Sequence, residues 1–284
     1  MIAVEDRQAI VVAIQRALAE DIGPGDVTSE WVLEPRLAAT ASLVVKEPGV
    51  IAGLEVVEEV FRQVNPEIRW QPLTAEGALV RAGEVVARVE GPAIALLSAE
   101  RVALNFLQRM SGIASEARRY VEAVRGTWAI ILDTRKTAPG LRVLDKLAVR
   151  LGGASNHRLG LYDMVLIKDN HIAAAGGITA AVQRARAQNR LGLPIEVEVT
   201  NLQQLAEAMA LRVDRILLDN MDLATMREAV AVVRREIPLE ASGGITLENV
   251  ADVAATGVDY ISVGALTHSV RALDISMEIE VCEA

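Results

Sequence analysis

Apolar residues recur at helical spacing in several stretches of the first part of the chain. The predicted helices cover residues 4–20, 54–64, 98–110 and 114–124. Alternation of apolar with polar residues predicts a strand over residues 38–45. Ser98 is a favourable N-cap for the third helix, and Ser111 with Gly112 predicts a break before the fourth. The first part of the chain is therefore expected to form a mixed α/β domain.

Residues 76–91 carry glycines at the corners of short apolar runs, which predicts a small β hairpin unit. Taken alone, this unit resembles the half-barrels of biotinyl and lipoyl carrier domains. Those carriers are modified on an exposed lysine in the hairpin, and this segment contains no lysine. We therefore interpret the unit as scaffold rather than as a carrier site.

From residue 128 onward a short apolar run, a polar loop and a helical pattern alternate regularly. The predicted strands cover residues 129–132, 164–167, 195–199, 215–218, 238–241 and 260–263. The predicted helices cover residues 139–151, 179–189, 202–210, 223–236 and 247–255, with Pro139 in the first turn of the first. Polar or glycine residues follow each strand, which predicts an incomplete TIM-like β/α barrel after the N-terminal α/β domain. A doubly wound open sheet is the alternative arrangement.

The composition narrows the class of protein. Of 284 residues, 51% are hydrophobic but only 3% aromatic, so the core is expected to consist mainly of aliphatic side chains, as in a buried parallel sheet. The net charge of −9 argues against general nucleic-acid binding. No apolar run is long enough for a bilayer, and the first residues do not resemble a signal sequence. We expect a cytoplasmic protein without nucleic-acid or membrane partners, and the single cysteine, Cys282, excludes a disulfide within the chain.

One segment is basic against this acidic background. Residues 133–171 hold seven Lys or Arg residues against four Asp. Gathering Arg135, Lys136, Arg158 and Lys168 in one site costs electrostatic repulsion, which a polyanionic ligand offsets. Arginine matches carboxylate and phosphate geometry with two parallel hydrogen bonds. The cluster predicts a site for small molecules with several carboxylates or phosphates, although each of these residues taken singly could be a solvated surface charge.

Other polar candidates fall at the ends of the later predicted strands, the rim where β/α barrels carry their active sites. Glu198 and Asp219 could hold sugar hydroxyls or Mg²⁺ bound to a diphosphate, while Asp219 could instead cap a turn. Glycine-rich turns follow the last two strands, where backbone N–H groups suit a phosphate unless the glycines only make tight turns. These turns comprise Ser242, Gly243 and Gly244, and Val263, Gly264 and Ala265.

Two carboxylates lie on the predicted strand 195–199. Its alternation places Glu196 and Glu198 on one face, and buried carboxylates need partners, for which Lys136 and Lys168 are candidates.

The histidines are candidates for hydrogen bonding. His157 could hydrogen-bond to an anionic ligand, and His171 is expected to brace its loop through Asp169 and Asn170. The chain has no HExxH motif and no Cys/His metal spacing, so a transition-metal site is not expected. A nucleophilic mechanism is equally poorly supported, because no serine lies in a nucleophile elbow.

Several longer motifs closely resemble those of quinolinate phosphoribosyltransferases, a family also called nicotinate-nucleotide pyrophosphorylases. They are Glu20-Asp-Ile-Gly-Pro-Gly-Asp-Val-Thr, Glu100-Arg-Val-Ala-Leu-Asn-Phe-Leu-Gln, Thr134-Arg-Lys-Thr-Ala-Pro-Gly-Leu-Arg, Asn156-His-Arg-Leu-Gly-Leu, Leu166-Ile-Lys-Asp-Asn-His, Glu196-Val-Glu-Val and Ile216-Leu-Leu-Asp-Asn. The resemblance covers nearly the whole chain. It departs at Gly152-Gly-Ala-Ser, where the family commonly has a third glycine, and this affects only the turn that leads to His157.

The resemblance implies a domain over residues 1–112, onto which the segment 270–284 packs, and a barrel domain over residues 113–269. It also implies a homodimer in which Arg101 of one chain reaches the barrel of the other. The residues that it assigns to the two carboxylates of quinolinate are Arg135, His157, Arg158 and Lys168, with Lys136 close to the reacting groups. Arg101 and Thr134 are further substrate-binding residues, and the implied catalytic residues are Lys136, Glu198 and Asp219. Those that it assigns to phosphoribosyl pyrophosphate are Glu198 and Asp219 for the ribose and Mg²⁺, and Ser242, Gly243, Gly244, Val263, Gly264 and Ala265 for the 5′-phosphate.

The implied activity is transfer of the phosphoribosyl group to quinolinate with decarboxylation, a step of de novo NAD biosynthesis that needs Mg²⁺ and no organic cofactor. Two other functions stay open at this point. A homologous branch linked to molybdenum transport shares the fold and differs in substrate. A non-catalytic anion-binding or carrier module is the alternative of another class, suggested by the hairpin unit at residues 76–91.

Overall fold

The structure is a computed structural model that describes residues 4–281, so Cys282 lies outside the described residues. The chain divides into two compact units, each described by itself below. The first comprises Met1–Arg118, Thr137–Gly153 and Ser269–Ala284, and the second Arg119–Lys136 and Ala154–His268. The domain boundaries suggested by the sequence stay a prediction.

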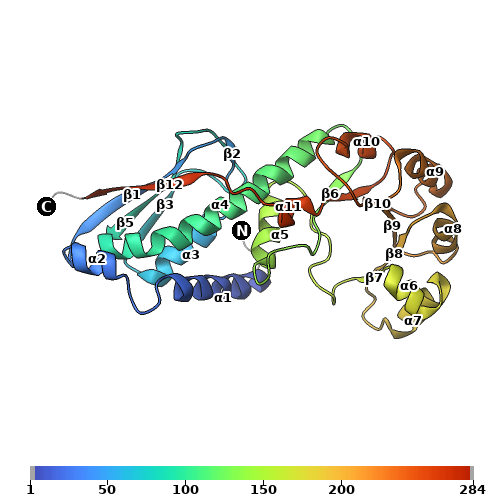
Figure 1. Ribbon diagram of the computed structural model, residues 1–284, viewed down its shortest axis with the longest axis horizontal. Coiled ribbons are helices and arrows are strands. Elements are labelled where there is room, and N and C mark those ends of the chain that lie inside the picture. Colours follow the sequence, from blue (N-terminus) through green and yellow to red (C-terminus); the bar gives the residue numbers. More distant parts are fainter. Residues whose placement is uncertain (1–3, 282–284) are drawn as a thin grey trace. The chain divides into compact units, whose positions relative to one another are not determined.

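An antiparallel sheet in the order β12-β1-β5-β3 forms the centre of the first unit. Its strands are β1 (Ala38–Val45), β3 (Arg69–Pro72), β5 (Val85–Pro92) and β12 (Ile275–Val281). The strand predicted over residues 38–45 is confirmed, and its residues Ala39, Ala41 and Leu43 are buried at alternate positions. The last strand pairs with β1 from Val45 opposite Ile275 to Ala39 opposite Val281, so segments more than 200 residues apart in the sequence lie side by side in one sheet (Figure 1).

The predicted hairpin unit is wrong. Strand β4 (Leu79–Val80) pairs with β2 (Gly49–Val50), while β5 pairs with β1 and β3. Pairing with β1 buries the apolar residues Val86, Ala87 and Val89 of β5, which a short local partner would leave exposed. The segment is therefore not a carrier half-barrel, and the interpretation as scaffold agrees with its place in the sheet.

Helices α3 and α4 lie alongside this sheet in Figure 1. The helices whose residues belong wholly or mainly to the first unit are α1 (Val4–Asp21), α2 (Val27–Val32), α3 (Leu54–Val64), α4 (Ala93–Ala123) and α5 (Arg142–Leu151). The predicted helices over residues 4–20 and 54–64 are confirmed. Helix α5 begins at Arg142, later than predicted, because Pro139 lies in the loop before it.

The predicted break in α4 is wrong, since one helix runs through both small residues. Ser111 is buried and its hydroxyl accepts a hydrogen bond from the Ala52 N–H at 3.0 Å. A Cβ on Gly112 would collide with the backbone of Arg271. Both residues are small because other segments pack closely against them. Neither residue ends the helix. Ser98 is likewise inside the helix and donates to the Ile94 carbonyl at 2.9 Å.

The second unit contains a parallel sheet in the order β6-β11-β10-β9-β8-β7. Its strands are β6 (Ile130–Leu132), β7 (Val165–Ile167), β8 (Ile195–Val199), β9 (Arg215–Asp219), β10 (Leu239–Ser242) and β11 (Tyr260–Ser262). Each strand from β7 to β11 pairs with the next, and β11 returns to β6, which is the order of a barrel. Within residues 4–281, β6 and β7 do not pair, so the predicted incomplete TIM-like barrel is confirmed. A doubly wound sheet would reverse its strand order, and this one does not.

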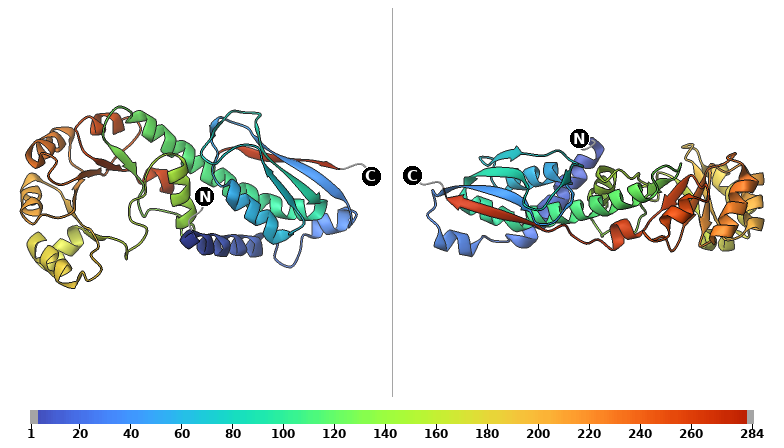
Figure 2. Two further views of the ribbon diagram at one scale, coloured as in Figure 1. Left: turned by 180° about the vertical axis from the view of Figure 1, so that it is seen from behind. Right: turned by 90° about the horizontal axis from the view of Figure 1, so that it is seen from above.

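Helices follow the strands, and those after β7, β8, β9 and β10 lie on the outer side of the curved sheet (Figure 2, left). They are α6 (Asp169–Ala175), α7 (Ile178–Gln188), α8 (Leu202–Ala210), α9 (Leu223–Val233), α10 (Val250–Ala254) and α11 (Ala265–His268). Helix α9 is shorter than predicted, because Arg234 adopts a left-handed conformation with φ 50° and ends it. Among the described residues, no helix combines the length and hydropathy that a bilayer span requires.

Candidate active site

The carboxyl ends of the six parallel strands border a pocket of about 620 Å³ in the second unit. Parallel strands present these ends at a common edge, which is why loops far apart in the sequence meet there. The predicted site residues that line the pocket are Thr134, Arg135, Lys136, His157, Arg158, Lys168, Glu198, Asp219, Ser242, Gly243, Gly244, Gly264 and Ala265.

Two predicted site residues do not line this pocket. Val263 is fully buried, and its N–H donates to the Leu132 carbonyl at 2.9 Å, so that group is used in the sheet. Arg101 belongs to α4 in the first unit. Its side chain is 58% exposed and lies 3.8 Å from the carboxylate of Glu100.

The basic side chains form the strongest electrostatic feature of the pocket. Burial, and then the nearby Arg135, lower the pKa of Arg158, which shows that two guanidinium groups share a partly desolvated space. The Nη1 of Arg158 donates a hydrogen bond to the Met164 carbonyl at 3.1 Å, which holds the guanidinium group in place. Lys168 pairs with Glu198 at 3.1 Å. Two neighbouring guanidinium groups in this position favour a bound anion.

The loop after β6 is held by a hydrogen bond within the loop and by one from α11. Thr134 accepts a hydrogen bond from the Lys136 N–H at 3.1 Å, and Thr267 donates to the Lys136 carbonyl at 2.9 Å. A Cβ on Gly264 would lie 3.1 Å from the side chain of Lys136. Glycine at this position therefore leaves room for the lysine, whose exposed ammonium group lies at the pocket.

The turn after β10 needs glycine for a definite reason. Gly243 has φ +95°, and a Cβ there would collide with the side chain of Asn220. Asn220 in turn donates to Asp219 at 3.0 Å. Gly244 also has positive φ, +63°, and its carbonyl accepts from Asn249 at 2.9 Å. The turn is thus rigid, with backbone beside the carboxylate that ends β9.

Two buried carboxyl groups, Glu196 and Glu240, lie beneath the basic side chains of the pocket. The sequence indicated Glu196 but not Glu240. A lysine partner was expected for Glu196. Its partner is instead His157, whose Nε2 lies 3.1 Å from Oε2 of Glu196. Glu240 was missed, although a glutamate inside the apolar run of β10 is itself a signal of a buried polar group. Burial, and then Glu196, raise the pKa of Glu240 to about 7. Burial also raises the pKa of Glu196.

His171 has the bracing role that the sequence suggested, with a different partner. Its Nδ1 accepts a hydrogen bond from the Lys168 N–H at 3.0 Å and so caps the start of α6. The ring therefore fixes the backbone that carries Lys168.

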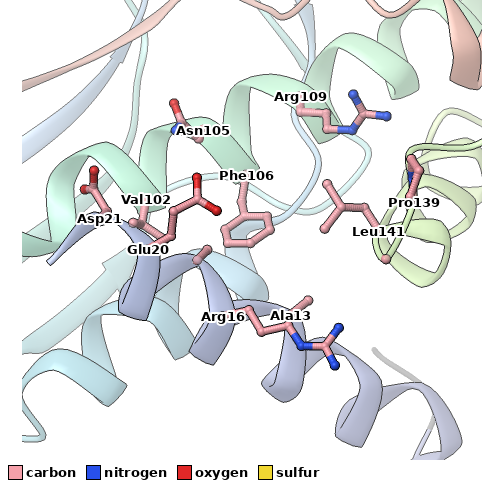
Figure 3. Close-up of a pocket in the computed structure, with 12 residues that line it drawn as sticks. Ala13, Arg16, Glu20, Asp21, Val102, Asn105, Phe106, Arg109, Pro139 and Leu141 are labelled. Carbon is pink, nitrogen blue, oxygen red and sulfur yellow. The ribbon is translucent and has the colours of Figure 1, made fainter. Parts of the chain in front are cut away.

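A second pocket, of about 430 Å³, lies in the first unit between α1, α4 and the loop before α5 (Figure 3). Phe106 and Leu141 supply apolar surface, and both acidic and basic side chains line the pocket. Its charged and amide residues are Arg16, Glu20, Asp21, Asn105 and Arg109. Arg109 is already engaged in a two-point contact with Asp145, at 2.8 and 2.9 Å. Mixed charge suits a polyanion less well than the pocket of the second unit does.

Comparison with known protein families identifies the family of this chain. Residues 26–111 match the family model described as the quinolinate phosphoribosyl transferase N-terminal domain. Residues 113–278 match the C-terminal domain of the same family. The chain belongs to the quinolinate phosphoribosyl transferase family. The resemblance inferred from the motifs is thereby confirmed.

Individual relatives support the membership over almost the full length. A probable nicotinate-nucleotide pyrophosphorylase [carboxylating] of Synechocystis is 49% identical, with 94% of this chain and 91% of the relative covered. A protein of the same description from Bacillus subtilis is 46% identical, with 92% and 90% covered. The crystal structure of NadC from Streptococcus pyogenes superposes with a TM-score of 0.92 at 40% identity, covering 95% of this chain and 96% of that one. The nicotinate-nucleotide pyrophosphorylase from Francisella tularensis superposes with a TM-score of 0.94 at 37% identity, covering 98% of both chains.

Proposed function

We propose that the protein transfers the phosphoribosyl group of phosphoribosyl pyrophosphate to quinolinate. The products are nicotinate mononucleotide, CO₂ and pyrophosphate, as in de novo NAD biosynthesis. The observation that carries the proposal is the single pocket in which Arg135, Arg158 and Lys168 converge with Glu198 and Asp219. Family membership supports the same reaction.

The cationic part of the pocket suits a pyridine dicarboxylate. Arg135 and Arg158 offer paired N–H donors for carboxylates, and Lys168 adds a point charge. Burial, and then the charge of Arg135, lower the pKa of Arg158, and an anion bound between the two guanidinium groups offsets both effects. Binding energy and orientation of quinolinate therefore come from the same residues.

The acidic residues and the glycine turns suit phosphoribosyl pyrophosphate. Glu198 and Asp219 can accept hydrogen bonds from ribose hydroxyls, and the backbone of Gly243, Gly244 and Gly264 can approach a phosphate closely. This division places the anomeric carbon of the sugar between the acidic and the basic residues. Lys136, whose side chain crosses Gly264, lies where it can meet the charge of the departing pyrophosphate.

Mg²⁺ fits the donor set of this pocket. Glu198 and Asp219 present carboxylate oxygens, the hard ligands that Mg²⁺ prefers, and both line the same cavity. When bound with the diphosphate, the ion would neutralise charge on the leaving group. We therefore propose Glu198 and Asp219 as the ligands of Mg²⁺.

The reaction follows from this placement. The lone pair of the pyridine nitrogen forms the bond to the anomeric carbon as the bond to pyrophosphate breaks, so both electrons leave with pyrophosphate. The ring nitrogen then carries a positive charge. The carbon–carbon bond to the adjacent carboxylate breaks, CO₂ leaves, and the electron pair that remains on the ring is stabilised by that charge until a proton is added. The protein contributes position and electrostatic stabilisation rather than a covalent intermediate.

We also propose that the active unit is a cytoplasmic homodimer in which Arg101 of one chain completes the pocket of the other. The exposure of the Arg101 side chain supports this assignment, because a guanidinium facing solvent is available to a second chain. Mixing an Arg101→Ala chain with an Arg135→Ala chain should restore some activity through hybrid sites. No recovery despite demonstrated subunit exchange would show that Arg101 acts within its own chain or not at all.

The direct test is incubation of the purified protein with quinolinate, phosphoribosyl pyrophosphate and Mg²⁺. Formation of nicotinate mononucleotide, with CO₂ and pyrophosphate in equal amounts, is expected. A panel with nicotinate and other pyridine or pyrimidine carboxylates separates this reaction from that of the molybdenum-linked branch. An Asp219→Asn chain should need more Mg²⁺ for half-maximal rate than wild type. Well-folded wild-type protein that yields no nicotinate mononucleotide would refute the proposal.

A further inference from the structure

Below the guanidinium groups of the second-unit pocket lies a buried layer of hydrogen-bonding groups. Nε2 of His157 lies 3.1 Å from Glu196 Oε2 and 3.5 Å from Glu240 Oε1. The side chains of both glutamates are fully buried, and that of His157 is 7% exposed. Glu240 Oε2 accepts from Nη1 of Arg215 at 2.9 Å. Arg215 is itself fixed, with its guanidinium 4.1 Å from the ring centre of Tyr260.

The hydrogen bonds around His157 specify one tautomer. Its Nδ1 accepts from the backbone N–H of Arg158 at 2.7 Å, so Nδ1 carries a lone pair. Nε2 must then carry the hydrogen, and Glu196 is its acceptor. The backbone of His157 is held as well, since its N–H donates to Asp133 at 2.8 Å. The imidazole therefore links the buried carboxyl groups to the backbone of Arg158.

Glu240 fits this layer as a neutral carboxylic acid. Glu196 Oε1 and Glu240 Oε1 are both buried and accept no hydrogen bond. A hydrogen on Glu240 that points to Glu196 gives both groups a partner, and the raised pKa of Glu240 is consistent with it. Arg215 then supplies the donor to the other oxygen. Glutamine has the same shape as the protonated glutamic acid, and like it presents one hydrogen-bond donor group and one acceptor group.

A metal ion is the competing occupant of this layer. One ligand atom from each of His157, Glu196 and Glu240 lies within 4.8 Å of the others. Three cations oppose it, because Arg215, Arg158 and Lys168 all act electrostatically on Glu196. Arg215 also occupies one oxygen of Glu240. The hydrogen-bonded arrangement is therefore favoured over a coordinated ion.

We propose that Glu240, anchored by Arg215, is a positioning residue: it orients Glu196 as the acceptor for the Nε2–H of His157, and His157 in turn fixes Arg158 for dicarboxylate binding. The identity of the dicarboxylate rests on the proposed function. If the ring turned over or changed tautomer, the N–H of Arg158 would lose its acceptor. The guanidinium of Arg158 would then no longer be aimed by both its backbone and its contact with Met164.

The test compares Glu240→Gln with Glu240→Ala in protein labelled with ¹⁵N at histidine. Only three histidines are present, so His171→Gln and His268→Gln chains assign the signals. Wild type and Glu240→Gln should both show a neutral Nε2–H imidazole for His157. Glu240→Ala should show a mixture of tautomers or a protonated ring. Its KM for quinolinate should rise about tenfold, the loss expected for one hydrogen bond to a charged group, while kcat and the KM for phosphoribosyl pyrophosphate change little.

Glu207→Ala is the matched control, since Glu207 accepts from Thr179 at 2.6 and 3.0 Å elsewhere in the same unit. It should leave the His157 signal and the quinolinate KM as in wild type. If Glu240→Ala does not fold, Arg215→Met provides the same test. It removes the hydrogen bond that Arg215 donates to Glu240, and the Arg215 side chain is partly exposed, so its loss is less disruptive.

A wild-type His157 signal and quinolinate KM in a folded Glu240→Ala or Arg215→Met chain would overturn the inference. Stoichiometric Zn²⁺ or Mn²⁺ on wild type, lost in Glu240→Ala, would overturn it in favour of a metal site. The imidazole signal does not depend on turnover. Absence of nicotinate mononucleotide from wild type would therefore refute the proposed function, while the signal would still decide the role of Glu240.

Discussion

Replacing Glu240 by glutamine should change how the stability of the protein depends on pH. Burial, and then Glu196, raise the pKa of Glu240 from 4.5 to about 7. The unfolded chain exposes this carboxyl to water, where it titrates near its ordinary value. Between the two pKa values the folded protein thus binds a proton that the unfolded chain has released. The stability that Glu240 contributes is complete below its unfolded pKa and is lost as the pH rises through about 7.

The size of the effect follows from the same shift. About 2.5 pKa units at ~1.4 kcal/mol each correspond to about 3 kcal/mol of unfolding free energy. Glutamine keeps the hydrogen bonds of the protonated acid but does not titrate. Relative to wild type, Glu240→Gln should therefore gain about 3 kcal/mol between about pH 4.5 and pH 8.

Urea unfolding of both proteins at several pH values measures this difference, with two probes because the chain has two units. The expected plots of unfolding free energy against pH diverge as the pH rises. Parallel plots for the two proteins would show that Glu240 titrates alike in the folded and the unfolded chain, and the account of its buried environment would be wrong.

Three further substitutions test other parts of the structure. Arg158→Lys keeps the charge but loses the forked donor, so the KM for quinolinate should rise about thirtyfold in steady-state assays, and an unchanged KM would remove Arg158 from the dicarboxylate site. Gly243→Ala forces a side chain onto positive φ and into Asn220, and should lower the unfolding free energy by about 1–3 kcal/mol and raise the KM for phosphoribosyl pyrophosphate. Asp145→Ala leaves Arg109 without its two-point partner and should cost about 2–3 kcal/mol in urea unfolding, less than a fully buried pair because Arg109 reaches solvent.

The barrel and most of the lining of its pocket could be predicted from the sequence. The reason is geometric: short apolar runs mark the strands, and parallel strands end at one edge, so residues such as Lys168 and Asp219 share a pocket although no local pattern joins them. The loop residues Arg135 and Arg158 stood out because their charge opposes that of the rest of the chain. Motif resemblance then suggested roles for them, which stay predictions.

The sequence pattern failed where a distant segment decides the local structure. Ser111 and Gly112 are a reasonable break when viewed alone, yet both are small because other segments press against α4. Strand β5 was assigned a neighbouring partner, and the longer apolar strand β1 took its place. Glu240 gave only one signal, a glutamate in an apolar strand. Its partners come from β8, β9, β11 and the loop that carries His157. Tertiary contacts of this kind carry no local periodicity.

Buried carboxyl groups beneath the guanidinium groups of the pocket explain how this cluster of positive charges is stable before an anion binds. Burial, and then repulsion by Arg135, lower the pKa of Arg158 at the mouth of the pocket. Asp163 and Glu196 act in the opposite direction on Arg158 and stabilise it in the free protein. If Glu240 were also ionised, the buried layer would neutralise more of the positive charge that attracts the substrate. Below about pH 7, a neutral Glu240 satisfies the hydrogen bonds of its neighbours without weakening that field.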